Sequence, residues 1–381
     1  MPSIVALPFT IPIYERGAGG IPSSFQVADL TGIVDRYSHS IKARGGFESC
    51  QIDLPVTMER AIEMISSWLM RSTIIFGPDG ETLFEGYLHS IEVSIGPVRR
   101  SISLDGLGNR VYVRYLDPIG ASVVTPVVTL ADSIATYGNK DWFQSLSSCS
   151  STAATNIAAA ILARRQWPRA ISTTSFTTGK PGPIRATLHF SGWYNAFGWV
   201  LYSNTDAATS TSTTTQVGNL LTTYNSTNAF FSTATNNIQS SGISDFVFSP
   251  IDATFQSKIE TLLAQGTSGN VRQSWGIYEN RIFYCNPWDG ATPTVITYQQ
   301  RIADGRVLND GGSPIPPWQM RPDSMLLIQD LLDPSPQSGT ADTAAYSFVE
   351  RVTYTVDRSG WQLRVEPETT NDLDAMLAVL R

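Results

Sequence analysis

The sequence predicts an α+β fold that is mainly β, with two similar β-barrels per chain and inserted mixed α/β regions. Three observations predict it. Short stretches such as 47–55 alternate apolar and polar residues and are bounded by Gly or Pro. Few stretches show helical spacing. The tetrapeptide Trp-Leu-Met-Arg at 68–71 returns as Trp-Gln-Met-Arg at 318–321, and strand-like residues follow it each time.

Length and charge narrow the class of protein. A chain of 381 residues predicts two to four compact units, and 42% hydrophobic residues are enough to build packed cores. Charged residues make up only 15% of the chain, and Ser and Thr fill much of the difference. The net charge of −7 argues against a nucleic-acid-binding face, because such a face is normally basic.

Targeting, membrane and disulfide signals are weak. The N-terminal segment has no basic start, and Pro8 and Pro12 interrupt its apolar run. No apolar run approaches the ~20 residues of a membrane helix, so we expect no membrane anchor. Cys50, Cys149 and Cys285 lie far apart without a CxxC motif, which predicts synthesis in a reducing cytosol.

The first unit contains strands and one helix. Cys50, Ile52 and Leu54 alternate with polar residues and predict the inward-facing row of a strand. Thr57 is expected to cap a helix with an apolar stripe at Ala61, Ile62, Ile65 and Leu69. The Gly77-Pro78-Asp79-Gly80 turn then joins two strands, because Pro78 presets φ and Gly80 accepts a positive φ.

The middle of the chain predicts helices within Ser/Thr-rich sequence. Residues 151–167 have a Ser or Thr cap and helix-favouring alanines, and Pro168 ends them. Residues 185–205 are rich in aromatic residues and predict strands. Segment 207–244 carries no charge, yet its apolar residues at helical spacing favour an ordered small domain: Val217, Leu220, Leu221 and Tyr224. A helix at 254–265 and a hairpin at 274–288 follow.

These elements predict the following division of the chain. The units are a first β-barrel at 1–117, a helical and Thr-rich connecting domain at 118–184, a second β-barrel at 185–205 plus 308–370, an inserted α/β domain at 206–307 and a C-terminal amphipathic helix at 371–381. The two barrels are inferred from the repeated tetrapeptide. After it, each unit shows a strand, a turn or loop, a long strand, a short break and a final strand. Unrelated β-proteins show a similar order of strands, so the duplication is a hypothesis.

No catalytic, cofactor-binding or metal-binding residue is predicted. His39, His89 and His189 share no motif, and HExxH, zinc spacings, GxSxG, GxxxxGK[ST] and GxGxxG are absent. The glycines of segment 77–86 lie at hairpin corners, so a phosphate loop is not expected. Without convergent polar groups, the sequence predicts a structural protein rather than an enzyme.

A carbohydrate-binding or glycoside-hydrolysing β-protein is one alternative. The carboxylate pairs nearest in sequence are Glu81 with Glu85 and Asp330 with Asp333, but nothing shows that either pair converges across a cleft. Aromatic side chains suggest either a sugar-stacking platform or, more commonly, a core or subunit interface: Trp193, Tyr194, Phe197, Trp199 and Tyr202.

The order of motifs resembles a phage family. GGFESCQIDLP (45–55), a helix, STIIFGPDGETLFEGYLHSIEVS (72–94) and SISLDGLG (101–108) resemble the first tube-type barrel of phage tail hub proteins. These hubs belong to the baseplate of contractile phages or the tail tip of siphophages. Four later segments are similar to minor tail proteins: GWYNAFGWVLY (192–202), GIYENRIFYCNPW (276–288), PPWQMRPDSMLLIQDLL (316–332) and SFVERVTYTVD (347–357).

This resemblance implies a homotrimer whose two tube-type barrels per chain form a pseudo-sixfold ring. The implied partners are a tail tube or distal tail protein, a tape measure protein and a central fibre or spike, with DNA only passing through the channel. The implied location is the virion tail tip, after assembly in the host cytoplasm. Because the chain lacks the long extension of some relatives, we expect a separate protein to contact the receptor. A distal-tail ring, usually a hexamer, is the second structural alternative.

Overall fold

The structure, a computed structural model, describes most of the chain: residues 9–174, 183–202, 210–246, 253–269, 271–287, 296–299, 307–308, 314–316, 318, 320–322, 325–329, 344–357 and 360–367. Strands outweigh helices, so the predicted α+β, mainly β class is confirmed. The described strands form sheets of 18, four and two strands. Among them β2 pairs only with β1 and β24 only with β23. The described pairings therefore close no barrel, in contrast to the two β-barrels expected from the sequence.

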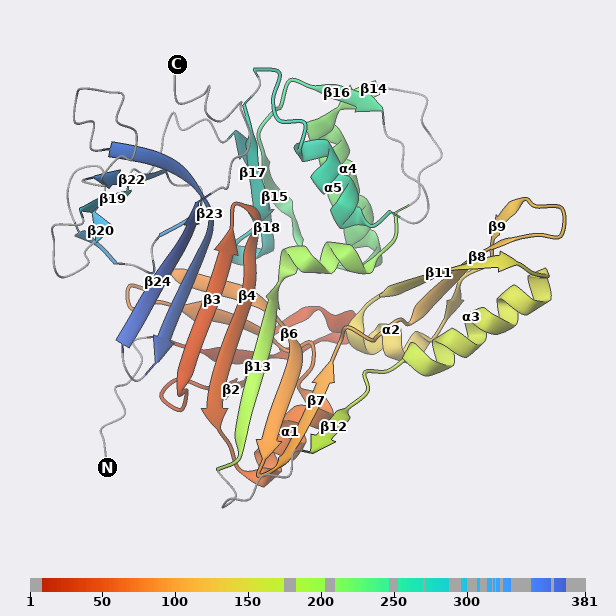
Figure 1. The fold of residues 1–381 in the computed structure, drawn as a ribbon, viewed down its shortest axis with the longest axis horizontal. Helices are drawn as coiled ribbons and strands as arrows, with labels where there is room; N and C mark the ends of the chain where they lie inside the picture. The colour runs from red at the N-terminus through yellow and green to blue at the C-terminus, as the bar shows by residue number, and fades with distance from the viewer. Residues whose placement is uncertain are drawn as a thin grey trace, which may run out of the picture.

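Eight antiparallel strands run side by side through the large sheet, from left to right in Figure 1. They are β24 (Gly360–Pro367), β23 (Ala344–Asp357), β3 (Arg36–Lys42), β4 (Arg44–Pro55), β13 (Arg185–Gly192), β6 (Thr82–Ile95), β7 (Val98–Ser103) and β12 (Ile171–Thr174). The expected row of Cys50, Ile52 and Leu54 on β4 is buried, as period-two alternation predicts.

A second layer covers the inner face of this sheet. It contains β1 (Pro12–Arg16), η1 (Ala18–Gly20), β2 (Pro22–Asp29), α1 (Met58–Ser67) and β5 (Ser72–Phe76). Phe9 contacts Tyr37 of β3 and Tyr354 of β23 with ring centroids 5.5 and 5.9 Å apart, which ties the two layers together. The shared core includes Trp68 and Tyr87, both fully buried.

Helix α1 and the turn after β5 follow the sequence prediction closely. Thr57 accepts a hydrogen bond from the Arg60 backbone N–H and caps α1. Gly80 has φ +82°, and its N–H donates to the Gly77 carbonyl at 3.1 Å in the turn between β5 and β6. The predicted apolar stripe is wrong at one residue. Ile62 is 61% exposed, because the buried side of α1 runs through Ala61, Met64 and Trp68 instead.

The repeat suggested by the two tetrapeptides corresponds to two three-stranded meanders. β5, β6 and β7 contain 5, 14 and 6 residues, and β22 (Met325–Gln329), β23 and β24 contain 5, 14 and 8. Neighbouring strands are antiparallel in both meanders. The meanders do not form separate sheets, since β13 lies between β6 and β4, and β3 lies between β23 and β4. Strands from distant parts of the chain are therefore interleaved in one sheet.

A small α/β arm projects from the main body on the right of Figure 1. It is built from β8 (Arg110–Leu116), β9 (Ser122–Val124), β10 (Val128–Thr129), α2 (Ala131–Tyr137), β11 (Asp141–Ser148) and α3 (Ser151–Arg165). Ser150 caps the predicted helix α3. The arm has its own core of six side chains: Val111, Val113, Tyr115, Ala154, Ala158 and Leu162.

The described residues between 193 and 287 pack against the upper end of the large sheet in Figure 1. They form η2 (Trp193–Trp199), β14 (Ser210–Ser212), α4 (Thr213–Thr227), β15 (Ser232–Ile238), β16 (Ser244–Phe246), α5 (Phe255–Leu263), β17 (Gln273–Ile277), η3 (Glu279–Arg281) and β18 (Ile282–Pro287). The predicted apolar face of α4 is buried, which confirms that the uncharged segment contains an ordered helix. Thr254 caps α5 with a capping box, and Asn280 stands at the predicted tip of the β17–β18 hairpin.

One stretch predicted as strand is wrong. β13 ends at Gly192, and the aromatic residues that follow form the 3₁₀ helix η2 instead of a second strand. Burial explains the difference, since all four aromatic residues are buried: Trp193, Tyr194, Phe197 and Trp199. A strand would have placed Tyr194 on the face opposite the other three, so packing overrides their β-propensity.

The remaining described strands are short: β19 (Ile296–Gln299), β20 (Val307–Leu308) and β21 (Pro314–Ile315). They extend the sheet beyond β22. The predicted C-terminal helix at 371–381 lies outside the described residues. The helices that the structure describes include none with the length and apolar character needed to cross a bilayer. The predicted division into domains stays a prediction.

Candidate functional site

The outer face of the eight-stranded run is polar from β24 to β7, whereas β12 adds the exposed apolar side chain of Ile171. Residues directly opposite one another on neighbouring strands share a face, and the register places hydroxyl, amide and charged side chains together there. Ser40 lies opposite Ser49 on β4 and Thr353 on β23, and His189 lies opposite Gln51 and Ser90. We call this surface the polar face. It also carries Ser38, Thr187, Ser94, Ser101 and Thr355.

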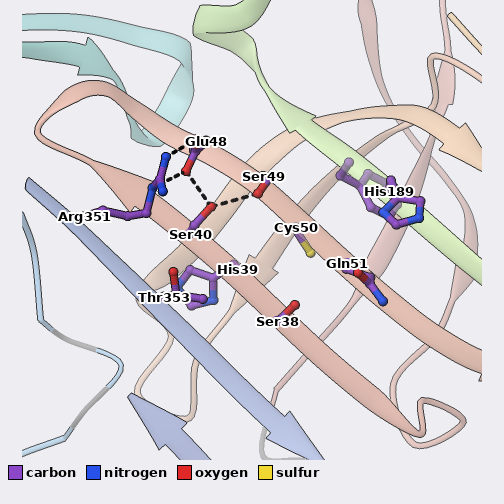
Figure 2. Close-up of a pocket in the computed structure, with 11 residues that line it drawn as sticks. Ser38, His39, Ser40, Glu48, Ser49, Cys50, Gln51, His189, Arg351 and Thr353 are labelled. Atoms are coloured by element: carbon purple, nitrogen blue, oxygen red, sulfur yellow. Dashed lines mark hydrogen bonds and ion pairs between the residues drawn. The ribbon is translucent and has the colours of Figure 1, made fainter. Parts of the chain in front are cut away.

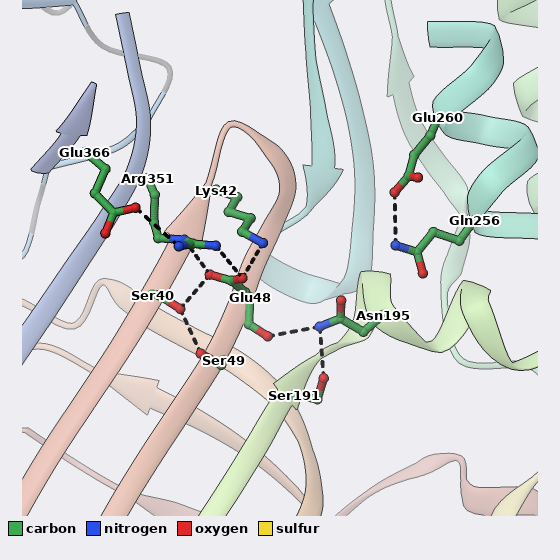
Figure 3. A network of polar contacts seen from close by, with 10 residues as sticks. All are labelled: Ser40, Lys42, Glu48, Ser49, Ser191, Asn195, Gln256, Glu260, Arg351 and Glu366. Carbon is green, nitrogen blue, oxygen red and sulfur yellow. Dashed lines mark hydrogen bonds and ion pairs between the residues drawn. The ribbon is translucent and has the colours of Figure 1, made fainter. Parts of the chain in front are cut away.

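A bulge directs one carboxylate onto this face. Ser40 pairs with Ser49 and Ile41 pairs with Phe47, so Glu48 is an extra residue on β4. A bulge re-aims the side chain of the extra residue, and here Glu48 points to the same side as Ser49. Its Oε2 atom accepts a hydrogen bond from the Ser40 hydroxyl at 3.0 Å (Figure 3).

Glu48 is the centre of a chain of ion pairs (Figure 3). Arg351 donates from Nη2 to Glu48 Oε1 at 3.0 Å, and its Nε lies 2.9 Å from Oε2. Lys42 forms an ion pair with the same carboxylate. Arg351 also donates from Nη1 to Glu366 of β24 at 3.2 Å, and Arg364 lies 3.1 Å from Glu366. The carboxylates therefore hold the cations of β3, β23 and β24 in place.

Cations elsewhere on the polar face have partners too. Arg99 lies 3.5 Å from Glu92, and Arg185 lies 2.9 Å from Asp35. Arg36 stands opposite two carboxylates, Asp53 and Asp357, in the strand register. The bases of the face are Arg36, Lys42, Arg99, Arg185, Arg351 and Arg364, and the acids are Asp35, Glu48, Asp53, Glu92, Asp357 and Glu366. Among the described residues of these strands the formal charges balance, so the strands themselves offer hydration without a free basic cluster.

A shallow hollow of about 370 Å³ opens in the polar face, between β23, β3, β4 and β13 (Figure 2). His39 and Cys50 form part of its floor, and Ser38, Gln51 and His189 part of its rim. No nucleophile–base pair is assembled here among the described residues. His39 is hydrogen-bonded to the Tyr37 hydroxyl at 2.8 Å, and burial, with a smaller contribution from Arg321, lowers its pKa to about 3. Such an imidazole is neutral at pH 7 and is a weak base.

The other histidine with a polar partner lies away from this hollow. His89 of β6 pairs through Nε2 with Asp105 at 2.7 Å. Burial lowers the His89 pKa, although Asp105 opposes the shift. Ser103 donates to Asp105 rather than to the histidine, at 2.6 Å, so the three side chains do not form a serine–histidine relay.

The carboxylate pairs considered for glycoside hydrolysis do not form a site among the described residues. Glu81 accepts a hydrogen bond from the Asp79 N–H within the turn before β6. Glu85 is buried on β6, 3.8 Å from Arg281, and burial raises its pKa to about 7. Asp330 and Asp333 lie outside the described residues.

The candidate sugar-stacking aromatics are core residues. Trp193, Tyr194, Phe197 and Trp199 are buried, and Tyr202 is partly buried against the same core. Phe197 stacks on Phe231 with ring centroids 4.2 Å apart, and Trp193 packs against Tyr87 at 5.0 Å. The faces of these rings contact other side chains, so they offer no platform to a ligand.

The described residues contain no group of three or more His, Cys, Asp or Glu side chains placed to hold a metal ion. Cys50, Cys149 and Cys285 are free thiols. Burial raises the pKa of the Cys285 thiol to about 12, and it also raises the pKa of Cys50, so both thiols are protonated and unreactive at neutral pH.

No protein-family model matches the chain, and no curated protein matches its sequence. Two solved structures are similar to it over most of their length. One is the tail protein from Neisseria meningitidis MC58, with 7% identity, a TM-score of 0.41 and coverage of 94% of this chain and 97% of the other. The second is the prophage MuSo2 43 kDa tail protein from Shewanella oneidensis, with 6% identity, a TM-score of 0.39 and coverage of 94% and 95%. At these TM-scores a function has to be argued from the residues of this chain.

Sequence reasoning missed the polar face. A signal for it exists, because Ser and Thr alternate with buried apolar residues in β3, β4, β13 and β6. The balance of charge was not readable from the sequence, since Glu48 and Arg351 are 303 residues apart in the chain.

Proposed function

We propose that this chain is a structural hub protein of a phage tail. Three copies would form a pseudo-sixfold ring that joins a hexameric tail tube to a threefold fibre or spike. The polar face would line a central channel through which DNA passes. The tail tube or distal tail protein, the tape measure protein and the fibre or spike are the proposed partners, and the virion tail tip, reached after assembly in the host cytoplasm, is the proposed location.

The charge-balanced polar face is the observation that carries this proposal. DNA binding by proteins gains most of its affinity when unpaired Lys and Arg replace the counterions of phosphates. Here cations of the polar face already form ion pairs with Glu48, Glu92 and Glu366. A surface lined by hydroxyl groups and paired charges stays hydrated and gives a passing polyanion little to bind, as a channel requires.

The two meanders support the proposed symmetry. β5–β6–β7 and β22–β23–β24 have the same strand order and nearly the same strand lengths, and both lie in one sheet. Three chains with two such meanders each provide six near-equivalent positions around an axis, which is what a match between sixfold and threefold partners needs. The resemblance of residues 45–108 to hub barrels points in the same direction.

Symmetry is the decisive test. The purified protein should give end-on electron micrographs with threefold symmetry and six similar densities around a central hole, and native mass spectrometry should give three times the chain mass. A ring of six chains would instead support the distal-tail alternative. A monomer at tail-assembly concentrations, with no ring in micrographs of the virion tail tip, would contradict the proposal.

A further inference from the structure

A groove of about 570 Å³ lies at the base of the arm, where α3 meets β7 and β12. We call it the arm groove. Its lining combines the hydroxyl groups of Ser101 and Ser103, the rings of Trp142 and Trp167, and the apolar side chains of Ile161 and Ile171. Three arginines complete it: Arg164, Arg165 and Arg169. A basic, partly aromatic groove is unexpected in a chain with a net charge of −7.

The arginines of the arm groove are available to an anion. Within the described parts of the chain, Arg164 and Arg169 form no ion pair. Arg165 lies 3.3 Å above the Trp142 ring and donates to the Gly106 carbonyl at 3.3 Å, which fixes its guanidinium at the edge of the groove. A guanidinium held in this way loses less conformational entropy on binding a carboxylate.

One acid lines the groove beside the three arginines, so the groove stays basic overall. This acid, Asp105, accepts a hydrogen bond from Ser103 at 2.6 Å and contacts His89 at 2.7 Å, which holds its side chain in place. Arg164 and Arg165 also complement the C-terminal dipole of α3, which explains why basic residues occur there. That effect does not extend to Arg169, which lies beyond the helix end.

Apolar surface and an open strand edge adjoin the arginines. Trp167 is 40% exposed and Ile171 is 64% exposed, so both present apolar area to solvent. Ile171 begins β12, which pairs with β7 on one side only among the described strands. The matching ligand is therefore an acidic peptide segment with apolar side chains near its carboxylates.

Residues 368–381 of this chain have that composition. The segment carries Glu368, Asp372 and Asp374, with Leu373 and Leu377 close to them, and Arg381 is its sole base. It follows β24, at the opposite end of the eight-stranded run from β12. Seven strand spacings amount to roughly 34 Å along the sheet. The segment therefore leaves β24 far from the groove of its own chain.

We propose that the arm groove binds residues 368–381 of a neighbouring copy. In a ring built by a head-to-tail contact, the β24 edge of one copy faces the β12 edge of the next, so the acidic segment leaves one chain beside the groove of another. Carboxylates then pair with Arg164, Arg165 and Arg169, and leucines cover Trp167 and Ile171. The inference rests on the homo-oligomer of the proposed function, but it does not need a particular number of subunits.

Photo-crosslinking tests the contact in the full-length protein. Trp167 is replaced by the photoreactive p-benzoylphenylalanine, which keeps an aromatic ring at this position, and equal amounts of ¹⁵N-labelled and unlabelled protein are co-assembled. Crosslinks between position 167 and residues 368–381 that join labelled to unlabelled chains are expected. Crosslinks confined to one chain, or to another part of the neighbouring copy, would overturn the proposal.

Charge reversal gives an independent test. R164E/R169E and D372K/D374K should each reduce this crosslink at least fivefold, the combination of all four should restore it, and R164K/R169K should retain it. A crosslink unchanged in R164E/R169E would refute the charge pairing. A third outcome would assign the groove to nucleic acid instead. In that case the wild type binds duplex DNA, R164E/R169E does not, and no crosslink to 368–381 forms. If micrographs show six chains but the crosslink persists, the hub proposal fails and the contact stands.

Discussion

Arg351 of β23 donates a hydrogen bond to Glu48 of β4 at 3.0 Å, across 303 residues of sequence. β3 lies between their strands, and the same carboxylate accepts from Ser40 on it. One bulged residue thus links distant parts of the chain, and together with Glu366 it fixes the orientation of the Arg351 guanidinium on the polar face.

Removing carboxylates from the polar face should create DNA binding. In E48Q/E92Q/E366Q the partners of Arg351, Arg99 and Arg364 lose their charge while side-chain size is kept. We expect the variant to retain duplex DNA at low salt, with an affinity that falls as salt rises with a log–log slope of roughly −3, about 0.9 per contacted phosphate. Fluorescence anisotropy over a salt series measures it.

A matched control separates this effect from net charge. E59Q/D79N/D132N removes the same number of charges from exposed residues on α1, the β5–β6 turn and α2. This variant should not bind DNA. Equal binding by both variants would show that overall charge, not the paired face, sets the response.

Gly192 should tolerate no side chain. It ends β13 against β4, and a Cβ atom there would lie 1.6 Å from the Phe47 carbonyl oxygen. Because backbone must move to relieve this overlap, G192A should lose at least about 3 kcal/mol of unfolding free energy. Urea denaturation measures it. G218A, in the open interior of α4, should instead gain about 0.5–1 kcal/mol.

Glu85 should make the protein less stable as pH rises. Burial raises its pKa from 4.5 to about 7, so the folded state binds a proton more tightly than the unfolded state does. The folding stability gained from this tighter proton binding is present below pH 4.5 and is lost as pH rises through 7. Relative to E85Q, the wild type should lose about 3 kcal/mol between pH 4.5 and 8. Equal pH dependence of the two proteins in urea denaturation would show that Glu85 does not titrate in this window.

His39 should make the protein less stable as pH falls, which is the opposite of the effect of Glu85. Its pKa falls from 6.5 to about 3 on burial, so the unfolded state binds the proton more tightly, and stability falls as pH decreases from 6.5 toward 3. Relative to H39F, the wild type should lose about 3 kcal/mol between pH 8 and 4. At pH 8 the variant itself should be about 1–3 kcal/mol less stable, because the Tyr37 hydroxyl loses its partner. A constant difference between the two proteins over this range would contradict the prediction.

Local structure was largely predictable from the sequence. Thr57 and Ser150 mark helix starts by capping, Gly80 marks a turn by its positive φ, and Val217, Leu220 and Tyr224 reveal the buried side of α4. These signals are local, because each arises within a few residues of backbone. The mainly β class follows from the same local patterns.

The parts that could not be predicted depend on contacts between distant residues. In η2, Trp193 packs against Tyr87 of β6, and Phe197 packs against Tyr224 of α4. A strand pattern does not reveal these distant contacts. The position of β3 beside β23, and the bulge that presents Glu48 to Arg351, require knowledge of strand order in the sheet. The same strand order defines the polar face.

The interleaving of β3 and β23 also determines when the protein can finish folding. A ribosome adding 5–20 residues per second needs roughly 15–60 s to make the approximately 300 residues between Glu48 and Arg351. During that time β3 pairs with β4 on one edge, but its other edge stays unpaired because β23 has not yet been synthesised. The nascent chain therefore exposes an unpaired edge in the cell until its last strands emerge, and slower translation would lengthen its exposure to aggregation.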